Sequence, residues 1–138
     1  MALGTLVDSN VLLDVLTENE TWLDWSSNAL ATAAEAGPLI INPIVYAEVS
    51  IRFSQIEDLD DALPPTDYRR VALPWESAFL AGKVFLDYRR RNKGTKASTL
   101  PDFFIGAHAA VAELHLLTRD ASRYRTYFPT VQLIAPRA

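Results

Sequence analysis

The chain has 138 residues, a length that suits one folded domain with a sizeable hydrophobic core. Hydrophobic residues make up 49% and charged residues 22%, which excludes an intrinsically disordered protein. The absence of cysteine excludes disulfides and thiolate zinc sites, and two histidines are too few for a His-rich zinc site. We see no signal peptide and no apolar stretch that could span a bilayer, so we expect a cytoplasmic protein with no membrane contact.

The net charge of −4 is divided unevenly along the chain. Residues 1–68 hold 12 acidic residues and one basic residue, a net of −11, whereas residues 69–138 hold 12 basic and five acidic residues, a net of +7. Such a division favours a polyanionic partner for the second half. A folded surface that mixes both signs is an equally good interpretation.

The first half of the chain alternates short apolar runs with helical patterns. Its predicted elements are, in chain order, a strand over 3–7, helices over 9–16 and 21–36, a strand over 39–41, helices over 43–53 and 55–63, and a strand over 68–73. The first strand stops at Asp8. Gly37 and Pro38 end the second helix, and Asn42 and Pro43 are suited to the cap and first turn of the third.

The second half continues the same alternation. Its predicted elements are a helix over 74–91, a helix over 100–113, a strand over 115–118, a helical turn over 121–127 and a strand over 131–134. The residues of the first helix that we expect to face inward are Ala78, Phe79, Ala81, Gly82, Phe85 and Leu86. Trp22, Trp25 and Trp75 are expected in the core, although each could stack on a base. His108 and His115 are interpreted as structural.

Strands that alternate with helices indicate an α/β fold. We predict a three-layer α/β/α sandwich around a parallel sheet of four to five strands, in one domain over residues 1–138. From the fold class we expect the strand order 3-2-1-4-5, which reverses between strands 1 and 4. Ligands bind beyond the strand ends at such a reversal. Asp8 ends strand 1 and Asp120 follows strand 4, so a site is predicted there.

Four acids, far apart in the chain, fall at junctions of this kind: Asp8, Glu48, Asp102 and Asp120. Each has an ordinary alternative role. Asp8 and Asp120 could cap helices, Asp102 could form a capping box with Thr99, and Glu48 could pair with Arg52. If the fold gathers the four, however, their mutual repulsion favours a bound cation.

Oxygen ligands of this kind suit Mg²⁺, with Mn²⁺ as a second choice. Such a metal can lower the pKa of a bound water, orient a phosphodiester and stabilise charge in the transition state. Asn10 and Thr118 are the polar neighbours that we expect to support the carboxylates or a metal-bound water, with ordinary turn bonding as the alternative.

Four stretches of the chain resemble the motifs of PIN-domain ribonucleases, and most closely those of the VapC toxins of bacterial type II toxin–antitoxin systems. The stretches are Val7 to Asn10, Asn42 to Glu48, Leu100 to Ala109 and Leu117 to Asp120. The tail from Asp120 to Val131 also reads like that group. One departure is that Asp102 has no further acid beside it, where many relatives carry one, which bears on the occupancy of a second metal.

The resemblance implies a Mg²⁺-dependent endoribonuclease with Asp8, Glu48, Asp102 and Asp120 as its catalytic metal site. It also implies a homodimer, a VapB-type antitoxin partner that covers the site, and a structured RNA, often a tRNA, as substrate. The residues that we expect to contact RNA are Arg89, Arg90, Arg91, Lys93, Lys96 and Arg119. The alternative for the basic run is a helix C-terminus that favours cations.

Three other readings stay open at this point. The chain could be a PIN-domain RNA-processing nuclease without an antitoxin, or a non-catalytic interaction module whose acids are caps and ion pairs. A haloacid-dehalogenase-like phosphatase ranks lower, because that class needs an Asp two residues after the first, where this chain has Asn10.

Overall fold

The structure is a computed structural model that describes residues 3–92 and 100–137. Its strands are β1 (Thr5–Val7), β2 (Leu39–Ile41), β3 (Tyr68–Arg70), β4 (His115–Leu117) and β5 (Leu133–Ile134). Its helices are α1 (Ser9–Leu16), α2 (Leu23–Ala36), α3 (Pro43–Ser50), α4 (Ile56–Ala62), α5 (Trp75–Arg91), α6 (Leu100–Ala112) and α7 (Ala121–Arg125). Every predicted element is present, with ends that shift by a few residues.

The five strands form one parallel sheet with the order β3-β2-β1-β4-β5, so the predicted strand order is confirmed. In the centre, Leu6 of β1 lies beside Ile40 of β2 and Leu116 of β4. All three side chains are at most 4% exposed. A parallel sheet with such apolar strands must be covered on both faces.

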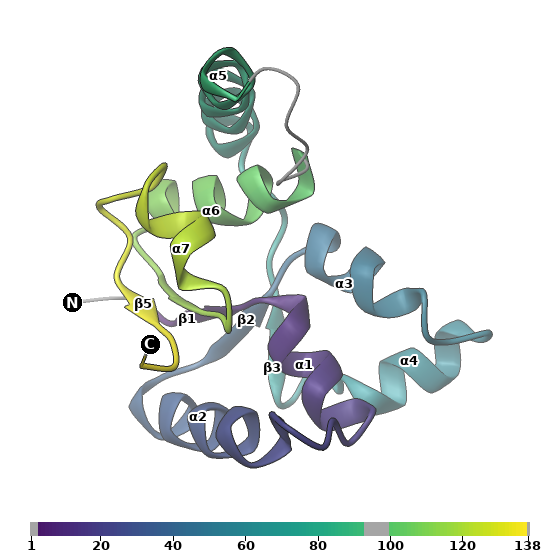
Figure 1. Ribbon diagram of the computed structural model, residues 1–138. Helices are drawn as coiled ribbons and strands as arrows, with labels where there is room; N and C mark the ends of the chain where they lie inside the picture. The colour runs from purple at the N-terminus through teal and green to yellow at the C-terminus, as the bar shows by residue number, and fades with distance from the viewer. Residues whose placement is uncertain (1–2, 93–99, 138) are drawn as a thin grey trace.

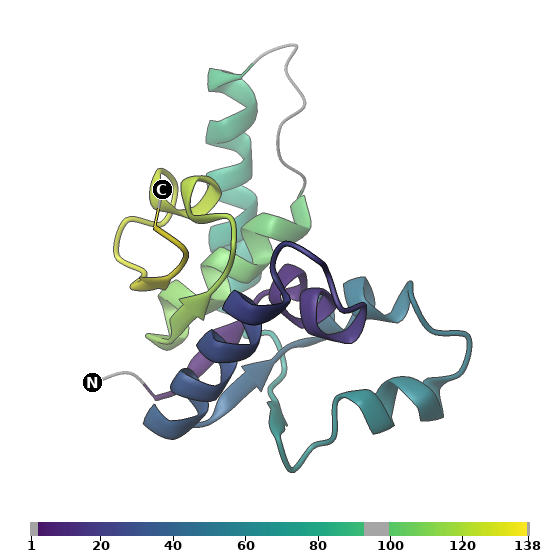
Figure 2. The same ribbon diagram turned by 60° about the horizontal axis from the view of Figure 1, so that its bottom comes forward.

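Helices supply that cover on both faces of the sheet. α6 and α7 lie on one side of the sheet, and α1 and α2 lie on the other (Figure 1). Figure 2 shows the same layers with α1 and α2 brought forward, and with α3 and α4 extending to one side. α5 packs mainly on α6, on the side away from the sheet. The three-layer α/β/α prediction is therefore confirmed.

An aromatic cluster joins α5, α6 and the segment after α7. Phe103 of α6 lies at its centre, with ring centroids 5.2 Å from Tyr88, 5.3 Å from Phe85, 5.7 Å from Tyr127 and 6.2 Å from Phe128. Edge-to-face and tilted contacts of this kind add stability beyond the burial of apolar area. The cluster fixes α6, and with it the position of Asp102, one residue before Phe103.

Gly106 on α6 is required by a close approach. A Cβ atom there would lie 2.4 Å from two ring carbons of Phe128, which is inside van der Waals contact. Gly82 on α5 has the opposite environment, because a Cβ atom would meet no neighbour within 4 Å.

The predicted inward face of α5 is wrong in part. Ala81 is fully buried, but Phe79 is 69% exposed and Leu86 is 44% exposed. Trp75, which we expected in the core, is 88% exposed. The buried residues of α5 are Ser77, Ala81 and Tyr88, so the helix is rotated relative to the sequence prediction.

Helix α3 is buried along one side. Val45 and Val49 are its fully buried residues, whereas Ile51, just after the helix, is 82% exposed. Asn42 caps the helix as predicted, since its Oδ1 accepts a hydrogen bond from the Val45 N–H at 2.9 Å. Within the described ranges, no helix combines the length and apolar character that crossing a bilayer needs.

Candidate active site

Asp8 follows β1 and is the N-cap of α1, so the capping role and the proposed site coincide in one residue. Its Oδ1 accepts the Ser9 N–H at 2.8 Å. Its Oδ2 accepts the hydroxyls of Thr118 at 2.8 Å and Tyr124 at 2.9 Å, with the Asn10 amide farther away at 3.5 Å. The carboxylate is 5% exposed and is held from three segments of the chain.

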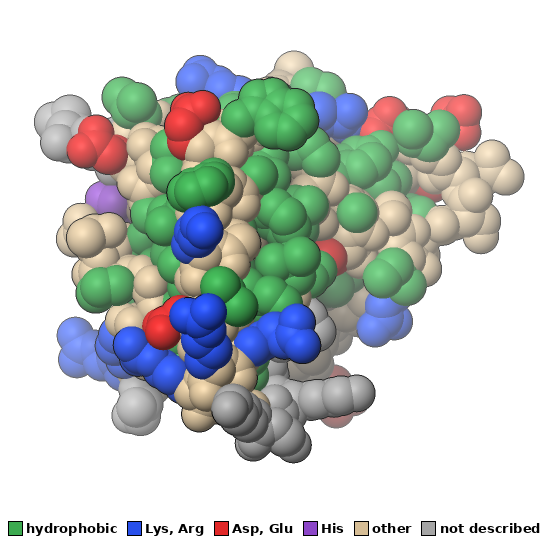
Figure 3. Space-filling model, turned by 90° about the horizontal axis from the view of Figure 1, so that it is seen from above, with side chains coloured by type: hydrophobic (Ala, Val, Ile, Leu, Met, Phe, Trp, Pro, Cys, Tyr) green, Lys and Arg blue, Asp and Glu red, His purple; other side chains and the backbone are tan. Residues whose placement is uncertain are grey.

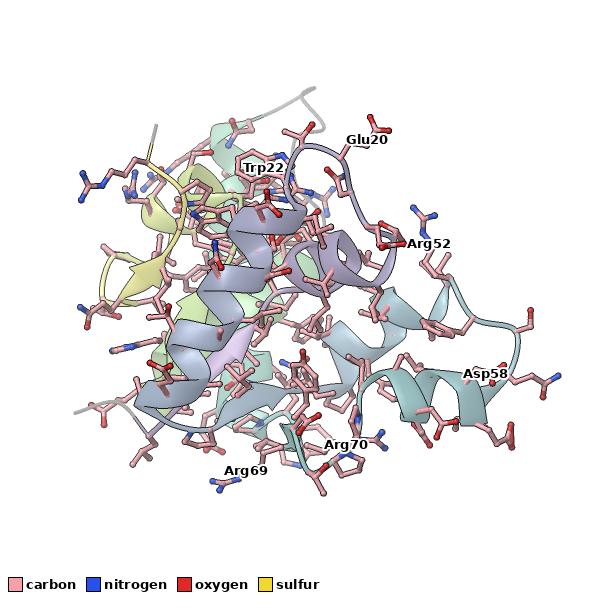
Figure 4. The ribbon with its side chains drawn as sticks, turned by 90° about the horizontal axis from the view of Figure 1, so that it is seen from below. Glu20, Trp22, Arg52, Asp58, Arg69 and Arg70 are labelled. Atoms are coloured by element: carbon pink, nitrogen blue, oxygen red, sulfur yellow. The ribbon has the colours of Figure 1, made fainter. Side chains whose placement is uncertain are left out.

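Ser9 connects Asp8 to Glu48. Its backbone N–H donates to Asp8, and its hydroxyl donates to Glu48 Oε1 at 3.0 Å. No ion pair between Glu48 and Arg52 is found among the described residues, and Figure 4 shows Arg52 pointing away from the body of the protein. The alternative role that we gave Glu48 is therefore wrong. Glu48 faces the acids instead of its neighbour on the helix.

Arg123 connects Asp102 to Asp120. Its Nη1 lies 3.0 Å from Asp102 Oδ2, and its Nη2 lies 3.2 Å from Asp120 Oδ2. Asp120 precedes α7, but its side chain makes no capping hydrogen bond to that helix. Thr99, the partner of Asp102 in the proposed capping box, lies outside the described residues.

Thr118 and Asn10 hold the segments together through hydrogen bonds. The Thr118 hydroxyl donates to Asp8, and its oxygen accepts the Asp120 N–H at 3.0 Å. Asn10 Oδ1 accepts the Arg119 N–H at 3.2 Å. The ends of β1 and β4 are thus tied directly together at the point where the strand order reverses.

The electrostatics of the cluster reflect its crowding. Burial raises the pKa of the Asp8 carboxyl, and the charge of Asp102 raises it further, against the hydrogen bonds from Thr118 and Tyr124. Burial also raises the pKa of Glu48, to which the charges of Asp8 and Asp102 add. Burial and the nearby acids hold the Tyr124 pKa well above its usual range, so this residue stays a hydroxyl donor.

The donor set suits a hard divalent cation, because it offers carboxylate oxygens whose negative charge is incompletely compensated. As they stand, however, no three His, Asp or Glu side chains in the described part of the chain are arranged to hold a metal ion. Arg123 contacts one oxygen of each of Asp102 and Asp120, and hydroxyl donors contact Oδ2 of Asp8.

The residues predicted to contact RNA fall into separate groups. Arg89, Arg90 and Arg91 are exposed in the last turn of α5, where Arg91 pairs with Asp87 at 3.2 Å. Figure 3 views the molecule from the side that carries α5. It shows Lys and Arg side chains gathered toward one edge of that side, beside a wide hydrophobic area. Lys93 and Lys96 lie outside the described residues.

Arg119 does not join the basic group, because internal contacts engage its side chain. Its Nε lies 2.6 Å from Asp14 Oδ2, and its guanidinium stacks over the Trp22 ring at 5.1 Å from the centroid. Asp14 is 2% exposed and also accepts the Ser26 hydroxyl at 2.6 Å. These contacts fix the start of α2 against the loop after β4, which favours a structural role over an RNA contact.

Sequence reasoning missed Arg123 and Tyr124. Both lie on α7, three and four residues after Asp120, a spacing that places them on the same side of a helical turn as that acid. This spacing was the available signal. The ion pair of Asp14 and Arg119 had no comparable signal, because 105 residues separate the two.

The chain belongs to the PIN domain family, whose sequence profile matches residues 5–129. A comparison with curated proteins gave no sequence match. The fold is similar to several solved structures of toxin–antitoxin complexes. The VapBC2 structure from Rickettsia felis, bound to a DNA fragment from its promoter, aligns with a TM-score of 0.72 and 17% identity, over 95% of this chain and 97% of that chain.

Two further structures show the same similarity. VapBC-1 from nontypeable Haemophilus influenzae aligns with a TM-score of 0.68 and 16% identity, over 95% of this chain and 96% of that chain. A toxin–antitoxin complex from Klebsiella pneumoniae aligns with a TM-score of 0.66 and 21% identity, over 97% of this chain and 98% of that chain. At sequence identities this low, the structural similarity establishes a common fold and nothing more.

Proposed function

We propose that this chain is a single-domain, Mg²⁺-dependent endoribonuclease that acts as the VapC-type toxin of a toxin–antitoxin pair in the cytoplasm. One observation carries the proposal. Asp8, Glu48, Asp102 and Asp120 come from four distant segments, and Ser9, Thr118 and Arg123 link them into one cluster at the carboxyl edge of the sheet. Membership of the PIN domain family supports the assignment of the reaction.

In this proposal the same four acids would hold Mg²⁺, with Mn²⁺ as a substitute. The bound metal supplies an activated water and positive charge against the scissile phosphate. The chain itself supplies the orientation of its ligands. Asp8 Oδ2 is saturated by hydroxyl donors, so Oδ1, which accepts one backbone N–H, is the oxygen left to face a cation. Such fixed donors reduce the reorganisation that accompanies cleavage.

The basic end of α5 is the proposed contact for the RNA backbone. Arg89, Arg90 and Arg91 are exposed. They form the C-terminal end of α5, the helix that precedes Asp102 in the sequence. Lysine and arginine contacts to phosphates release counterions, so binding weakens as salt rises. Replacing the three arginines with glutamine should weaken binding to a structured RNA, such as a tRNA, and flatten the dependence of affinity on salt. An unchanged salt slope would count against this contact.

Two protein partners belong to the proposal. The similar structures from Rickettsia felis and Haemophilus influenzae are VapBC complexes, which supports a VapB-type antitoxin for this chain. A homodimer is supported by the outer face of α5, where Trp75, Phe79 and Leu86 are 88%, 69% and 44% exposed. Replacing Trp75 and Phe79 with serine should shift the protein from dimer to monomer in sedimentation experiments. A monomeric unmodified chain would count against the dimer.

The test of the reaction is RNA cleavage by the purified chain with Mg²⁺ and with EDTA. Asp8→Asn should abolish cleavage while the circular dichroism spectrum is retained, because the change removes the charge and keeps the shape. Asp58→Asn is the matched control, since Asp58 is exposed on α4 (Figure 4). Full activity of Asp8→Asn, or cleavage that persists in EDTA, would refute the proposal. A small neighbouring gene for an antitoxin separates a toxin from a PIN-domain RNA-processing nuclease.

A further inference from the structure

The acid cluster already contains a cation, which is the Arg123 guanidinium. Its two terminal nitrogens contact two different carboxylates, Asp102 at 3.0 Å and Asp120 at 3.2 Å. The positive charge of Arg123 also acts on Glu48. The proposed metal site would need these three acids, and the Arg123 side chain alone offsets part of the repulsion among them.

The two kinds of contact in the cluster differ in how easily they can change. Tyr124 is 1% exposed, and its ring is packed in the core, so its hydroxyl is fixed against Asp8. The Arg123 side chain is 34% exposed and is long and flexible, so it can turn into solvent without moving α7. Asp120, one of its two partners, is also partly exposed, with 39% of its side chain accessible.

We propose that Arg123 is a positioning residue that occupies the acid cluster in the metal-free chain and releases Asp102 and Asp120 when a divalent cation binds. This inference rests on the proposed function, since it concerns the same carboxylates. In the metal-free state, Arg123 holds the two acids at a fixed separation despite their repulsion. Because Arg123 and a divalent cation compete for the negative charge of the same two carboxylates, and because their own positive charges repel, Arg123 lowers the affinity of the site for metal.

The experiment compares Mn²⁺ and Mg²⁺ binding to the full chain by titration calorimetry. Arg123→Gln removes the competing cation, and Arg123→Lys keeps the charge but can contact one carboxylate at a time. Arg125→Gln is the matched control, because Arg125 is an exposed arginine on the same helix and its loss changes the net charge equally. In parallel, the melting temperature of each variant is measured in EDTA and with saturating metal.

We expect Arg123→Gln to bind Mn²⁺ about tenfold more tightly than the unmodified chain, the scale set by two partly exposed ion pairs. Arg123→Lys should fall between the two, and Arg125→Gln should match the unmodified chain. In EDTA, Arg123→Gln should melt at a lower temperature and should gain more stability from metal than the unmodified chain does.

Equal or weaker metal affinity of Arg123→Gln, next to normal binding by the unmodified chain, would overturn this inference alone. If the unmodified chain binds no metal, both the proposed function and this inference are overturned. If Arg123→Gln does not fold, Arg123→Lys decides the question, because unchanged Mn²⁺ affinity in that variant also overturns the inference.

Discussion

The hydroxyl of Tyr124 provides a direct measure of how the structure stabilises the charge of Asp8. Tyr124→Phe removes one oxygen and keeps the buried ring. The Asp8 carboxylate is 5% exposed, and Tyr124 and Thr118 are the two short donors to its Oδ2, at 2.9 Å and 2.8 Å. A buried hydrogen bond to a charged group contributes about 1.5–3 kcal/mol, so we expect a loss of that size in the free energy of unfolding.

For a domain of this size, such a loss corresponds to a fall in melting temperature of roughly 5–10 °C. The assay is urea denaturation of the metal-free chain in EDTA, monitored by circular dichroism. Tyr46→Phe is the matched control, because the Tyr46 hydroxyl donates to the Asp60 carboxylate at 2.7 Å in a more exposed setting. That variant should lose much less stability, since water can replace the missing donor.

The effect of Tyr124→Phe should also depend on pH. The hydroxyl lowers the Asp8 pKa, so it stabilises the ionised carboxylate, while burial raises that pKa above its ordinary value. The stability difference between the unmodified chain and Tyr124→Phe should therefore be full at neutral pH and should shrink as pH falls through the raised pKa of Asp8. Equal losses in Tyr124→Phe and Tyr46→Phe, or a difference that is constant with pH, would refute this reasoning.

The charges of the acid cluster and the surroundings of two glycines lead to three further predictions. Because burial and neighbouring acids raise the Glu48 pKa, its ionised form costs stability at neutral pH; Glu48→Gln should raise the melting temperature in EDTA at pH 7, and the gain should vanish below the ordinary pKa of Glu. Gly106→Ala should destabilise the chain by about 1–3 kcal/mol, because the new methyl overlaps an aromatic ring. Gly82→Ala, on an open helix surface, should instead stabilise it by about 0.5–1 kcal/mol in the same denaturation experiment.

The arrangement of the sheet could be predicted because its signals are local. The central strands are short apolar runs beside a clear stop, such as Asp8 after β1 or Gly37 before β2, whereas the edge strand β3 contains Arg69 and Arg70. The alternation of strands and helices then limits the possible topologies, and the acid-bearing junctions follow from the strand order. The edge of the sheet that carries Asp8 and Asp120 could therefore be predicted from the sequence alone.

The rotation of α5 could not be predicted, because the helix carries two apolar stripes. One contains Trp75, Phe79 and Leu86, and the other contains Ala81 and Tyr88. Helical periodicity fits both, and the choice depends on which stripe matches the aromatic residues of α6. That match is a tertiary contact between segments that the local pattern does not relate.

The internal ion pair of Arg119 was equally hidden. An arginine beside a candidate acid suggests a phosphate contact when only the sequence is known. The structure directs it to Asp14 and Trp22, on elements far away in the chain. Whether a basic residue is free to contact RNA or is paired inside the protein depends on the folded structure, and the amino-acid composition does not indicate it.

The distribution of the cluster along the chain has a consequence for its synthesis. Asp8 leaves the ribosome well before its hydroxyl donors, Thr118 and Tyr124, which follow more than a hundred residues later. A nascent or prematurely terminated polypeptide therefore contains the first acid without its partners. For a toxin, this order would delay the formation of an active site until the segment that carries Thr118 and Tyr124 has been translated.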